Sequence, residues 1–298
     1  MFEYLGLDYF LDHSKRVFIF YLLSSLFMAL LFFWKQKEVF KEQFSKKTVF
    51  HPSARLDYSY FLVVSVVKFF LIIPFVLGVN EVSLWFLLHF QELFGYVERI
   101  RISKIGLIFT YTLLLFLVND FTRYLLHRLM HKSTFLWRFH KVHHSAEVLN
   151  PLTFYRVHPL ENVLFGLRYA FSIGFVTACF VYLFGAGVSS LQIIGLNIFG
   201  FIFLLLGSNL RHSHIPLSYG KKIEKWIISP YQHQLHHTPK SMNSNFGSSL
   251  SVWDRLFKTL EISTPHPQKP LVFGLSKENI QHSLLGAFVH PLYQGVKL

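Results

Sequence analysis

Long uncharged stretches dominate the pattern of apolar and polar positions along this chain. Residues 17–34 give 18 consecutive uncharged positions, and residues 169–210 give 42. A helix rises about 1.5 Å per residue, so roughly 20 apolar residues cross the hydrocarbon core of a membrane. The first stretch predicts one span. The second is interrupted by the turn-like sequence GAGVSS at 185–190 and predicts a helical hairpin over 162–208.

Two further spans are predicted at 61–79 and 105–126, and the helix of the second is expected to continue through His131. Segment 81–97 is apolar but contains a histidine and a glutamate, which favours an interfacial or half-inserted position. Runs of this length exclude a membrane barrel, whose strands are about ten residues long. The pattern predicts an all-α fold with one structural domain, built as an integral membrane bundle of about four to six helices.

The composition favours a membrane protein over a soluble one. Hydrophobic residues make up 52% of the chain and aromatic residues 18%, and only 15% of the residues are charged. Soluble domains carry about 25% charged residues. The single cysteine, Cys179, excludes disulfides within the chain and any cluster held by several cysteines.

The formal net charge of +13 raises the alternative of nucleic-acid binding, but the distribution of charge argues against it. Lys and Arg outnumber Asp and Glu in segments 35–59, 127–161 and 211–298, which lie between or after the predicted spans. The positive-inside rule places such segments in the cytoplasm. We therefore expect a cytoplasmic helical cap and no nucleic-acid partner. One misfit is the basic segment 99–104, which would lie on the opposite side unless 81–97 crosses the membrane.

Histidines concentrate where the predicted spans end, and they are spaced as metal ligands are. Eleven of the 17 histidines lie between positions 127 and 237. Residues three or four apart share one face of a helix, and this spacing joins His127 to His131 and recurs in the sequences HKVHH and HQLHH. These two sequences contribute His140, His143, His144, His233, His236 and His237, and single histidines occur at His158, His212 and His214.

So many imidazoles at one membrane face predict two metal ions, because one ion seldom takes more than six ligands. Imidazole binds iron, copper, nickel and zinc, so the residue type leaves the metal open. One HxxxH pair arises readily by chance, whereas two HxxHH sequences beside it do not. His158 precedes a proline, where a packing role is as expected as a ligand role. Of His212 and His214, one is expected to bind metal.

The alternative function is a membrane metal transporter or storage protein that uses the same histidines. Transport requires ligands inside the spans to mark an ion path. Here the spans are nearly free of His, Asp and Glu, and the histidines gather at one face, so an enzyme is favoured. An inactive scaffold is disfavoured because the HxxxH pair and both HxxHH sequences are present.

Four blocks of sequence follow one another in the order DFTRYLLHRLMH at 120–131, LWRFHKVHHSAEVLNPLTFYRVHPLE at 136–161, SPYQHQLHHT at 229–238 and NFGSSLSVWDRLFKTL at 245–260. In order and spacing they resemble the sterol desaturase and fatty acid hydroxylase superfamily. The resemblance is specific and covers about half the chain, to about Gly274. It implies an integral membrane, non-haem di-iron oxygenase that uses O2 and two external electrons to hydroxylate or desaturate a lipid chain or sterol.

The resemblance also implies which residues hold the two iron ions. By motif, they are His127, His131, His140, His143, His144, His158, His212, His233, His236 and His237. His214 stands where the family has asparagine, which puts a ligand at that position in doubt. Asp120 lies seven residues before His127 and is expected either to accept a hydrogen bond from a ligand imidazole or to pack and cap the helix. Asn245 and Asp254 are expected to fix the C-terminal segment over the site.

Electrons must come from outside, because the chain has no GxGxxG fingerprint and no cysteine set for an iron–sulfur cluster. A separate reductase, ferredoxin or cytochrome is expected to dock on the cytoplasmic face. The basic segment 211–298 suits an acidic carrier. It equally suits anionic lipid.

Three regions are expected: N-terminal spans with an interfacial segment at 1–104, a catalytic core at 105–265, and a C-terminal cytosolic tail packed on the core at 266–298. We expect a multi-pass membrane protein with its site on the cytoplasmic side. A bacterial inner membrane is favoured over the endoplasmic reticulum, because the sequence contains no retrieval or lipidation signal. The lipid substrate is expected to approach laterally from the bilayer. The identity of the lipid and the choice between hydroxylation and desaturation stay open.

Overall fold

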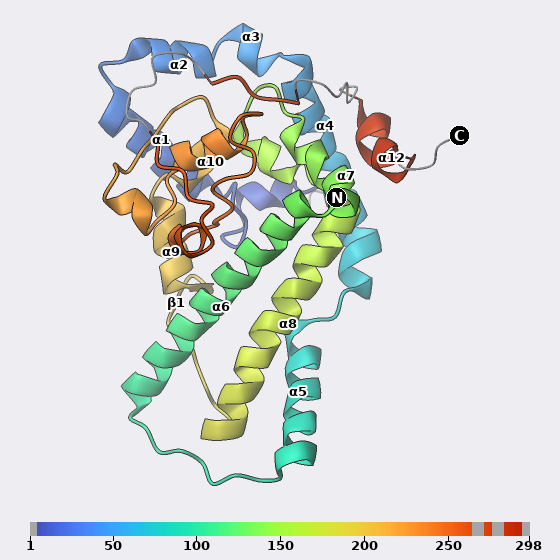
Figure 1. Ribbon diagram of the computed structural model, residues 1–298, viewed down its shortest axis with the longest axis vertical. Helices are drawn as coiled ribbons and strands as arrows, with labels where there is room; N and C mark the ends of the chain where they lie inside the picture. Colours follow the sequence, from blue (N-terminus) through green and yellow to red (C-terminus); the bar gives the residue numbers. More distant parts are fainter. Residues whose placement is uncertain (1–4, 264–270, 276–282, 294–298) are drawn as a thin grey trace.

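The protein has a wide helical part above a narrow one (Figure 1). This computed structural model describes residues 5–263, 271–275 and 283–293. We call helices α5, α6 and α8 the stalk, and the other described elements the head. The prediction of an all-α fold is confirmed, since the described chain is mostly helical and its only strands are two residues long. About half of the tail predicted at 266–298 lies outside the described residues.

The first helices are η1 (Leu7–Phe10), α1 (Ile19–Phe33), α2 (Lys37–Gln43), α3 (Lys46–Val49), α4 (Pro52–Val67), the π-helical η2 (Lys68–Ile72) and η3 (Ile73–Phe75). They are followed by α5 (Val79–Phe94), α6 (Lys104–Lys132), α7 (Thr134–His144), η4 (Pro151–Tyr155) and α8 (Pro159–Phe184). The remaining elements are β1 (Gln192–Ile193), β2 (Leu196–Asn197), α9 (Ile198–Leu205), η5 (Ser208–His212), η6 (Ile223–Lys225), α10 (Pro230–His236), α11 (Val252–Leu256) and α12 (Leu284–Tyr293).

Two helices of the stalk are long and apolar enough to cross a membrane. Helices α6 and α8 contain 29 and 26 residues, which corresponds to roughly 40 Å at the usual rise per residue. In the described part of the chain, no other helix passes the same test of length and composition. The two helices pack together, and the hydroxyls of Tyr111 and Thr177 lie 2.9 Å apart between them.

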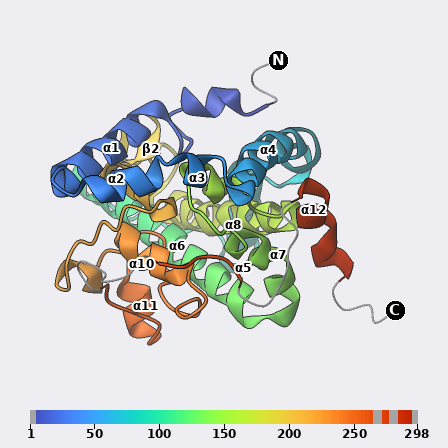
Figure 2. The ribbon, with the colours of Figure 1, turned by 90° about the horizontal axis from the view of Figure 1, so that it is seen from above.

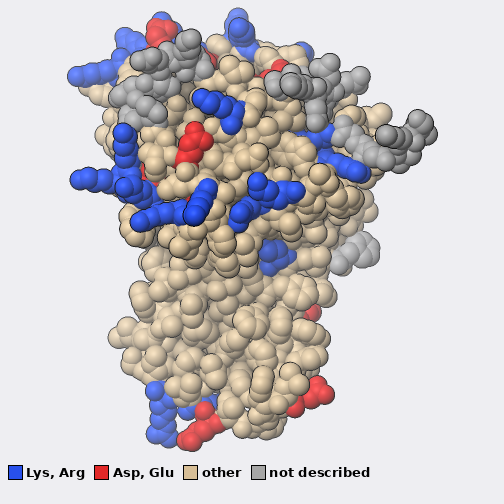
Figure 3. All heavy atoms as spheres, viewed as in Figure 1, with Lys and Arg blue, Asp and Glu red and all other residues tan. Residues whose placement is uncertain are grey.

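The third stalk helix, α5, runs along the lower part of α8 (Figure 1). Gly174 permits the close approach, because a Cβ at that position would lie 2.9 Å from a side-chain carbon of Val82. Most of segment 81–97 is thus a helix packed on α8. The basic segment 99–104 lies at the foot of the stalk, where charged side chains reappear below a belt of uncharged residues (Figure 3).

The prediction of a helical hairpin over 162–208 is wrong for its second arm. After α8, the chain forms the small antiparallel pair β1–β2 and only then the short helix α9. Ile194 and Gly195 turn between the strands with φ of 45° and 74°. Polar backbone groups are satisfied by α6, since Leu191 N–H donates to Thr112 Oγ1 at 2.7 Å. Uncharged composition alone could not distinguish this path from a helix.

The segments predicted as spans at 17–34 and 61–79 lie in the head (Figures 1 and 2). Helix α1 has 15 residues, and the second segment changes from α to π and then to 3-10 geometry after Val67. Neither is a regular helix of membrane-spanning length. The number of four to six membrane helices therefore stays a prediction.

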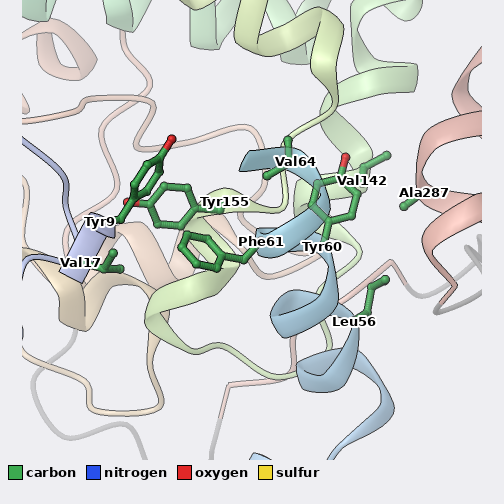
Figure 4. Close-up of a cluster of buried hydrophobic side chains, with 9 residues drawn as sticks. All are labelled: Tyr9, Val17, Leu56, Tyr60, Phe61, Val64, Val142, Tyr155 and Ala287. Carbon is green, nitrogen blue, oxygen red and sulfur yellow. The ribbon is translucent and has the colours of Figure 1, made fainter. Parts of the chain in front are cut away.

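An aromatic core joins the N-terminal segment to α4 and η4 inside the head (Figure 4). The rings of Tyr9, Phe61 and Tyr155 lie 5.0 to 5.8 Å apart between centroids. Aromatic side chains of this size dominate the energetics of a core. The packing fixes η4, which connects the region of α7 to α8.

A buried ion pair ties the same connection to α4. The Nε of Arg156 donates to Asp57 Oδ1 at 2.6 Å, and both side chains are fully buried. Asp57 Oδ2 also accepts from Asn150 Nδ2 at 2.8 Å and from Thr153 Oγ1 at 2.6 Å. A buried pair is favourable only when further hydrogen bonds satisfy it, and here they do. The network holds the chain directly after α7 in a fixed position.

Candidate metal centre

The HxxHH sequences lie on two short helices with well-defined starts. Helix α7 begins after Ser133, whose hydroxyl accepts from the N–H of Leu136 at 3.3 Å. Helix α10 begins at Pro230 with a capping box between Ser229 and Gln232, each side chain accepting the other's backbone N–H. Such caps fix where a helix starts. All six histidines of the two sequences are buried.

The structure gathers nine histidines into two groups. Within each group, one ring nitrogen per residue lies within 4.8 Å of the others. The first group contains His127, His131, His140, His144 and His236, and the second contains His143, His212, His233 and His237. Nine of the ten residues predicted from the sequence are thus brought together.

Each HxxHH sequence contributes to both groups. On α7, His143 joins the second group while its two neighbours at i−3 and i+1 join the first. On α10 the assignment is reversed, and His236 joins the first group. Consecutive residues of a helix point about 100° apart, so one helix can face two adjoining sites. The groups are neighbours, because the rings of His144 and His237 stack at 4.6 Å between centroids.

Backbone carbonyls orient two imidazoles of the first group. The Nδ1–H of His127 donates to the carbonyl of Phe246 at 2.8 Å, and the Nδ1–H of His236 donates to the carbonyl of Ser244 at 2.7 Å. A carbonyl oxygen only accepts, so the proton is on Nδ1 and the lone pair is on Nε2. Metal-ligating histidines are held in this way. The two Nε2 atoms face each other at 3.1 Å.

Glu161 orients a third imidazole of the first group, a role that the sequence analysis missed. Its Oε1 lies 2.9 Å from the Nδ1 of His140, and both side chains are buried. The signal was available, since Glu161 is the acid of the sequence HPLE at the start of α8. Its spacing from His140 reveals nothing without the fold, because the two residues lie on different helices.

Many of the remaining ring nitrogens are buried without a hydrogen-bond partner. In the described residues they are Nε2 of His131 and His140, Nδ1 of His143 and His233, and both nitrogens of His144 and His237. The Nε2 of His212 instead lies 3.3 Å from that of His143 and 3.3 Å from that of His233. Buried polar atoms nearly always have partners. These nitrogens therefore fit the donor set of a metal site.

Burial keeps the imidazoles in the neutral form that binds metal. Burial, reinforced by neighbouring histidines, lowers the pKa well below the ordinary value of 6.5 for His143, His144, His212, His233 and His237. The pKa of His236 is lowered to about 3 by the same burial. Lone pairs are thus available at neutral pH.

Asp120 does not accept a hydrogen bond from a ligand imidazole, which was one of its two expected roles. Its carboxylate accepts from the N–H groups of Ser249 and Leu250 at 2.8 and 3.0 Å and from Trp253 Nε1 at 2.9 Å. Seven residues correspond to about 10 Å along a helix, which puts His127 out of reach. Asp120 instead holds the segment 245–260 against α6.

Asp254 and Asn245 fix that segment over the first group, as the sequence suggested. Asp254 accepts from the N–H of Phe246 at 2.8 Å and from the next N–H along the chain at 2.7 Å. The Nδ2 of Asn245 donates to the carbonyl of Gln232 on α10 at 3.1 Å. These bonds place the Phe246 carbonyl behind His127.

Two predicted or doubtful histidines lie outside both groups. His158 caps α8 by accepting from the N–H of Leu160 at 3.1 Å, and its Nε2 donates to the carbonyl of Phe288 at 3.1 Å. The Nε2 of His214 accepts from the N–H of Leu149 at 3.2 Å. Each of these rings thus forms hydrogen bonds with the backbone.

A cavity of about 650 Å³ reaches both histidine groups. Its wall includes His127 and His140 from the first group and His143, His212 and His233 from the second. The wall also includes residues of η2, η3 and α8, among them Ile72, Ile73 and Phe165. The cavity thus connects the histidines with the upper end of the stalk.

The chain belongs to the sterol desaturase and fatty acid hydroxylase superfamily. The family model described as fatty acid hydroxylase matches residues 112–259, which contain all nine grouped histidines. No solved structure matches the chain significantly.

Several curated proteins match about half of the chain. An ornithine lipid hydroxylase of Rhizobium tropici is 30% identical over 152 residues, which are 50% of this chain and 41% of that protein. An alkylglycerol monooxygenase of Caenorhabditis elegans is 27% identical over 177 residues, 59% of this chain and 31% of the relative. A methylsterol monooxygenase of Rattus norvegicus is 30% identical over 145 residues, 48% and 43% of the two chains. The matches thus span less than half the length of these relatives.

Proposed function

We propose that this chain is an integral membrane oxygenase that holds two iron ions in its two histidine groups and hydroxylates or desaturates a membrane lipid. The observation that carries the proposal is the gathering of nine histidines in two adjoining groups beside a cavity at the top of an apolar stalk. The family and the three relatives, whose names describe lipid hydroxylation or monooxygenation, support a lipid substrate.

In this proposal the nine grouped histidines are the ligands, and His158 caps α8 instead. Iron, when bound, supplies the activation of O2 that an unreactive C–H bond requires. The protein's own part is to present neutral Nε2 and Nδ1 lone pairs. His127, His140 and His236 are held for this by their bonds to Phe246, Glu161 and Ser244.

The reaction consumes electrons that the chain does not supply. Hydroxylation converts R–H, O2, two electrons and two protons into R–OH and water, and desaturation converts the same inputs into an alkene and two waters. We propose that a separate reduced carrier protein, a reductase, ferredoxin or cytochrome, delivers these electrons at the head. The Lys and Arg side chains of the head support an acidic carrier or a contact with anionic lipid (Figure 3).

We propose that the stalk crosses the membrane and that the head lies on the cytoplasmic side. In support, α1 exposes Phe20, Leu23, Phe27 and Leu31 by 51 to 64%, an apolar face that suits lipid contact. The proposed arrangement is multi-pass, with four to six membrane helices and a cytoplasmic cap, in a bacterial inner membrane. In this proposal residues 1–104 form N-terminal membrane spans and an interfacial segment, 105–265 the catalytic core, and 266–298 a cytosolic tail packed on the core.

The first test is metal content per chain, by elemental analysis with Mössbauer spectroscopy on protein purified in mild detergent. We expect close to two coupled irons. Zinc alone, or a single loosely held ion after iron-replete expression, contradicts the oxygenase and favours storage, transport or hydrolysis.

A matched pair of variants then links the metal to the histidines. We expect His212→Ala to lose metal from the second group and to abolish formation of an oxidised lipid in reductant-fed membranes. We expect His214→Ala, two residues away and outside both groups, to retain metal and product. Equal activity in the two variants would rule out the second group as a metal site.

A further inference from the structure

Five cationic side chains line the cavity beside the histidines. They are Arg16, Lys68, Arg123, Arg168 and Arg211, and they come from the N-terminal segment, η2, α6, α8 and η5. Among the described residues of the cavity wall the only acid is Glu161, whose Oε1 is already bonded to His140. Metal ions in the histidine groups would add more positive charge to the same space.

Arg156, a buried arginine that stabilises the fold, offers a comparison with these cavity cations. It is fully buried, and its Nε lies 2.6 Å from Asp57. Among the residues that the structure describes, no ion pair joins any of the five cavity cations to a carboxylate. Asp120 and Glu161 act on Arg123 only at longer range, and Asp120 acts in the same way on Arg168 and Arg211. A cation that is largely removed from water and has no carboxylate in direct contact is costly, so such residues favour a bound anion.

The partners of the cavity arginines are neutral. Arg16 and Arg211 donate to the backbone carbonyls of Ser208 and Ile228 and lie over the rings of Phe154 and Phe203, at 4.7 and 4.5 Å from the centroids. Among the described residues, the Nε of each has no hydrogen-bond partner. Arg16, Arg123 and Arg211 line the same cavity, and burial lowers the pKa of Arg16, with the charges of the other two lowering it further.

Two of the cations lie inside stalk helices. Arg168 is nine residues after the start of α8, or roughly 13 Å along the axis. Its Nη1 donates to Asn119 and Thr122 of α6 at 2.9 Å, and its Nε has no partner. Arg123 is one helical turn from His127 and lies over the ring of Phe165 at 5.5 Å. Charged residues at such positions are rare unless they bind something.

We propose that the cavity binds a lipid with an oxyanion headgroup, a carboxylate or a phosphate, which Arg16, Arg123, Arg168 and Arg211 contact while the chain lies against Ile72, Ile73 and Phe165. Arginine suits this role because its planar group binds carboxylates and phosphates in a bidentate manner. The proposal rests on the proposed function, because it names the substrate class for the same site. It selects anionic lipids over sterols and other uncharged lipids.

The test measures binding to metal-free protein in an uncharged detergent, so that it does not depend on oxidation. The probes are palmitate, hexadecyl phosphate and hexadecanol, which share one chain and differ in the headgroup, together with inorganic phosphate. We expect at least one of the two anionic probes to bind about tenfold or more tightly than hexadecanol. Arg123→Gln and Arg168→Gln should each remove most of that preference, Arg168→Lys should restore part of it, and the exposed Arg55→Gln should leave it unchanged.

Each outcome decides between the alternatives. Equal affinity for hexadecanol and both anions, or an unchanged preference in both Gln variants with normal melting temperatures, overturns the proposal. Competition by inorganic phosphate as strong as by hexadecyl phosphate would assign the cations to a free anion and also overturn it. If the preference holds but the metal-loaded protein oxidises no lipid, the proposed function fails while the anionic site stands.

Discussion

The two histidine groups share residues of α7 and α10, while α6 contributes to the first group and η5 to the second, and the two groups are supported differently. In the first group, His127, His140 and His236 each have an acceptor behind Nδ1. In the described part of the second group, ring nitrogens face only each other or nothing, although His143 approaches the backbone of Arg156. Hydrogen bonds behind a ligand raise its basicity and fix its orientation. We infer that the first group is better prearranged for metal than the second, which is held mainly by burial.

Of the changes considered, lowering the pH should have the largest effect on the stability of the two groups. Six histidines outside the stalk have pKa values lowered by burial, and four of them form the second group. The unfolded chain takes up protons near pH 6.5 and the folded chain does not. Stability is therefore present above that pH and lost as the pH falls below it, by up to about 1.4 kcal/mol per pH unit for each histidine.

We therefore expect the melting temperature of metal-free protein in detergent to fall steeply between pH 7 and pH 5, and less steeply when metal is bound. His233→Leu should make the fall shallower, whereas the same change at the exposed His13 should not. A melting temperature that is flat over this range would contradict the buried, neutral state of the second group.

Glu161→Gln should have the next largest effect, and it should lower metal affinity in the first group only. Glutamine keeps an acceptor near His140 but removes the negative charge that raises the basicity of its Nε2. We expect metal affinity to fall about 10-fold to 100-fold in the first group and to stay unchanged in the second. Chelator titration with a spectroscopic readout of each metal would measure this. In wild-type protein the second group should lose its metal first, and a reversed order would break the comparison.

The sequence predicted which histidines lie together better than how they are arranged. The HxxxH pair and the two HxxHH sequences contain eight of the nine grouped histidines, because residues three or four apart lie on one side of a helix in any fold. Which group each histidine joins depends on how α7 and α10 face each other, and no local pattern encodes that. Of the two roles expected for Asp120, the hydrogen bond to a histidine of the site is wrong, because two helical turns along α6 exceed hydrogen-bond reach. Glu161 went unassigned because its partner lies on another helix.

The stalk and the chain that follows it show a similar limit to predicting the fold from the sequence. Apolar stretches correctly predicted α6 and α8, the two helices that are both long enough and apolar enough to cross a membrane. Beyond Phe184 the same composition forms β1–β2 and a short helix, because Thr112 on α6 satisfies polar groups that a helix would otherwise pair. Hydropathy indicates only that a segment is apolar. Its secondary structure depends on which groups form hydrogen bonds with its polar groups.

Asp254→Asn should give the smallest effect, because it acts on the first group through two intermediates. Asparagine can accept one of the two N–H bonds at Phe246 and Gly247 but presents a donor to the other. The Phe246 carbonyl would shift behind His127, and we expect the first group to lose about fivefold in metal affinity, on the order of 1 kcal/mol. The exposed Lys258→Gln, from the same segment, is the matched control, and affinity is read by chelator titration as for Glu161. An equal loss in both groups would mean that the segment stabilises the head as a whole. A loss confined to the first group would mean that a carboxylate with no contact to any histidine sets the orientation of one of them.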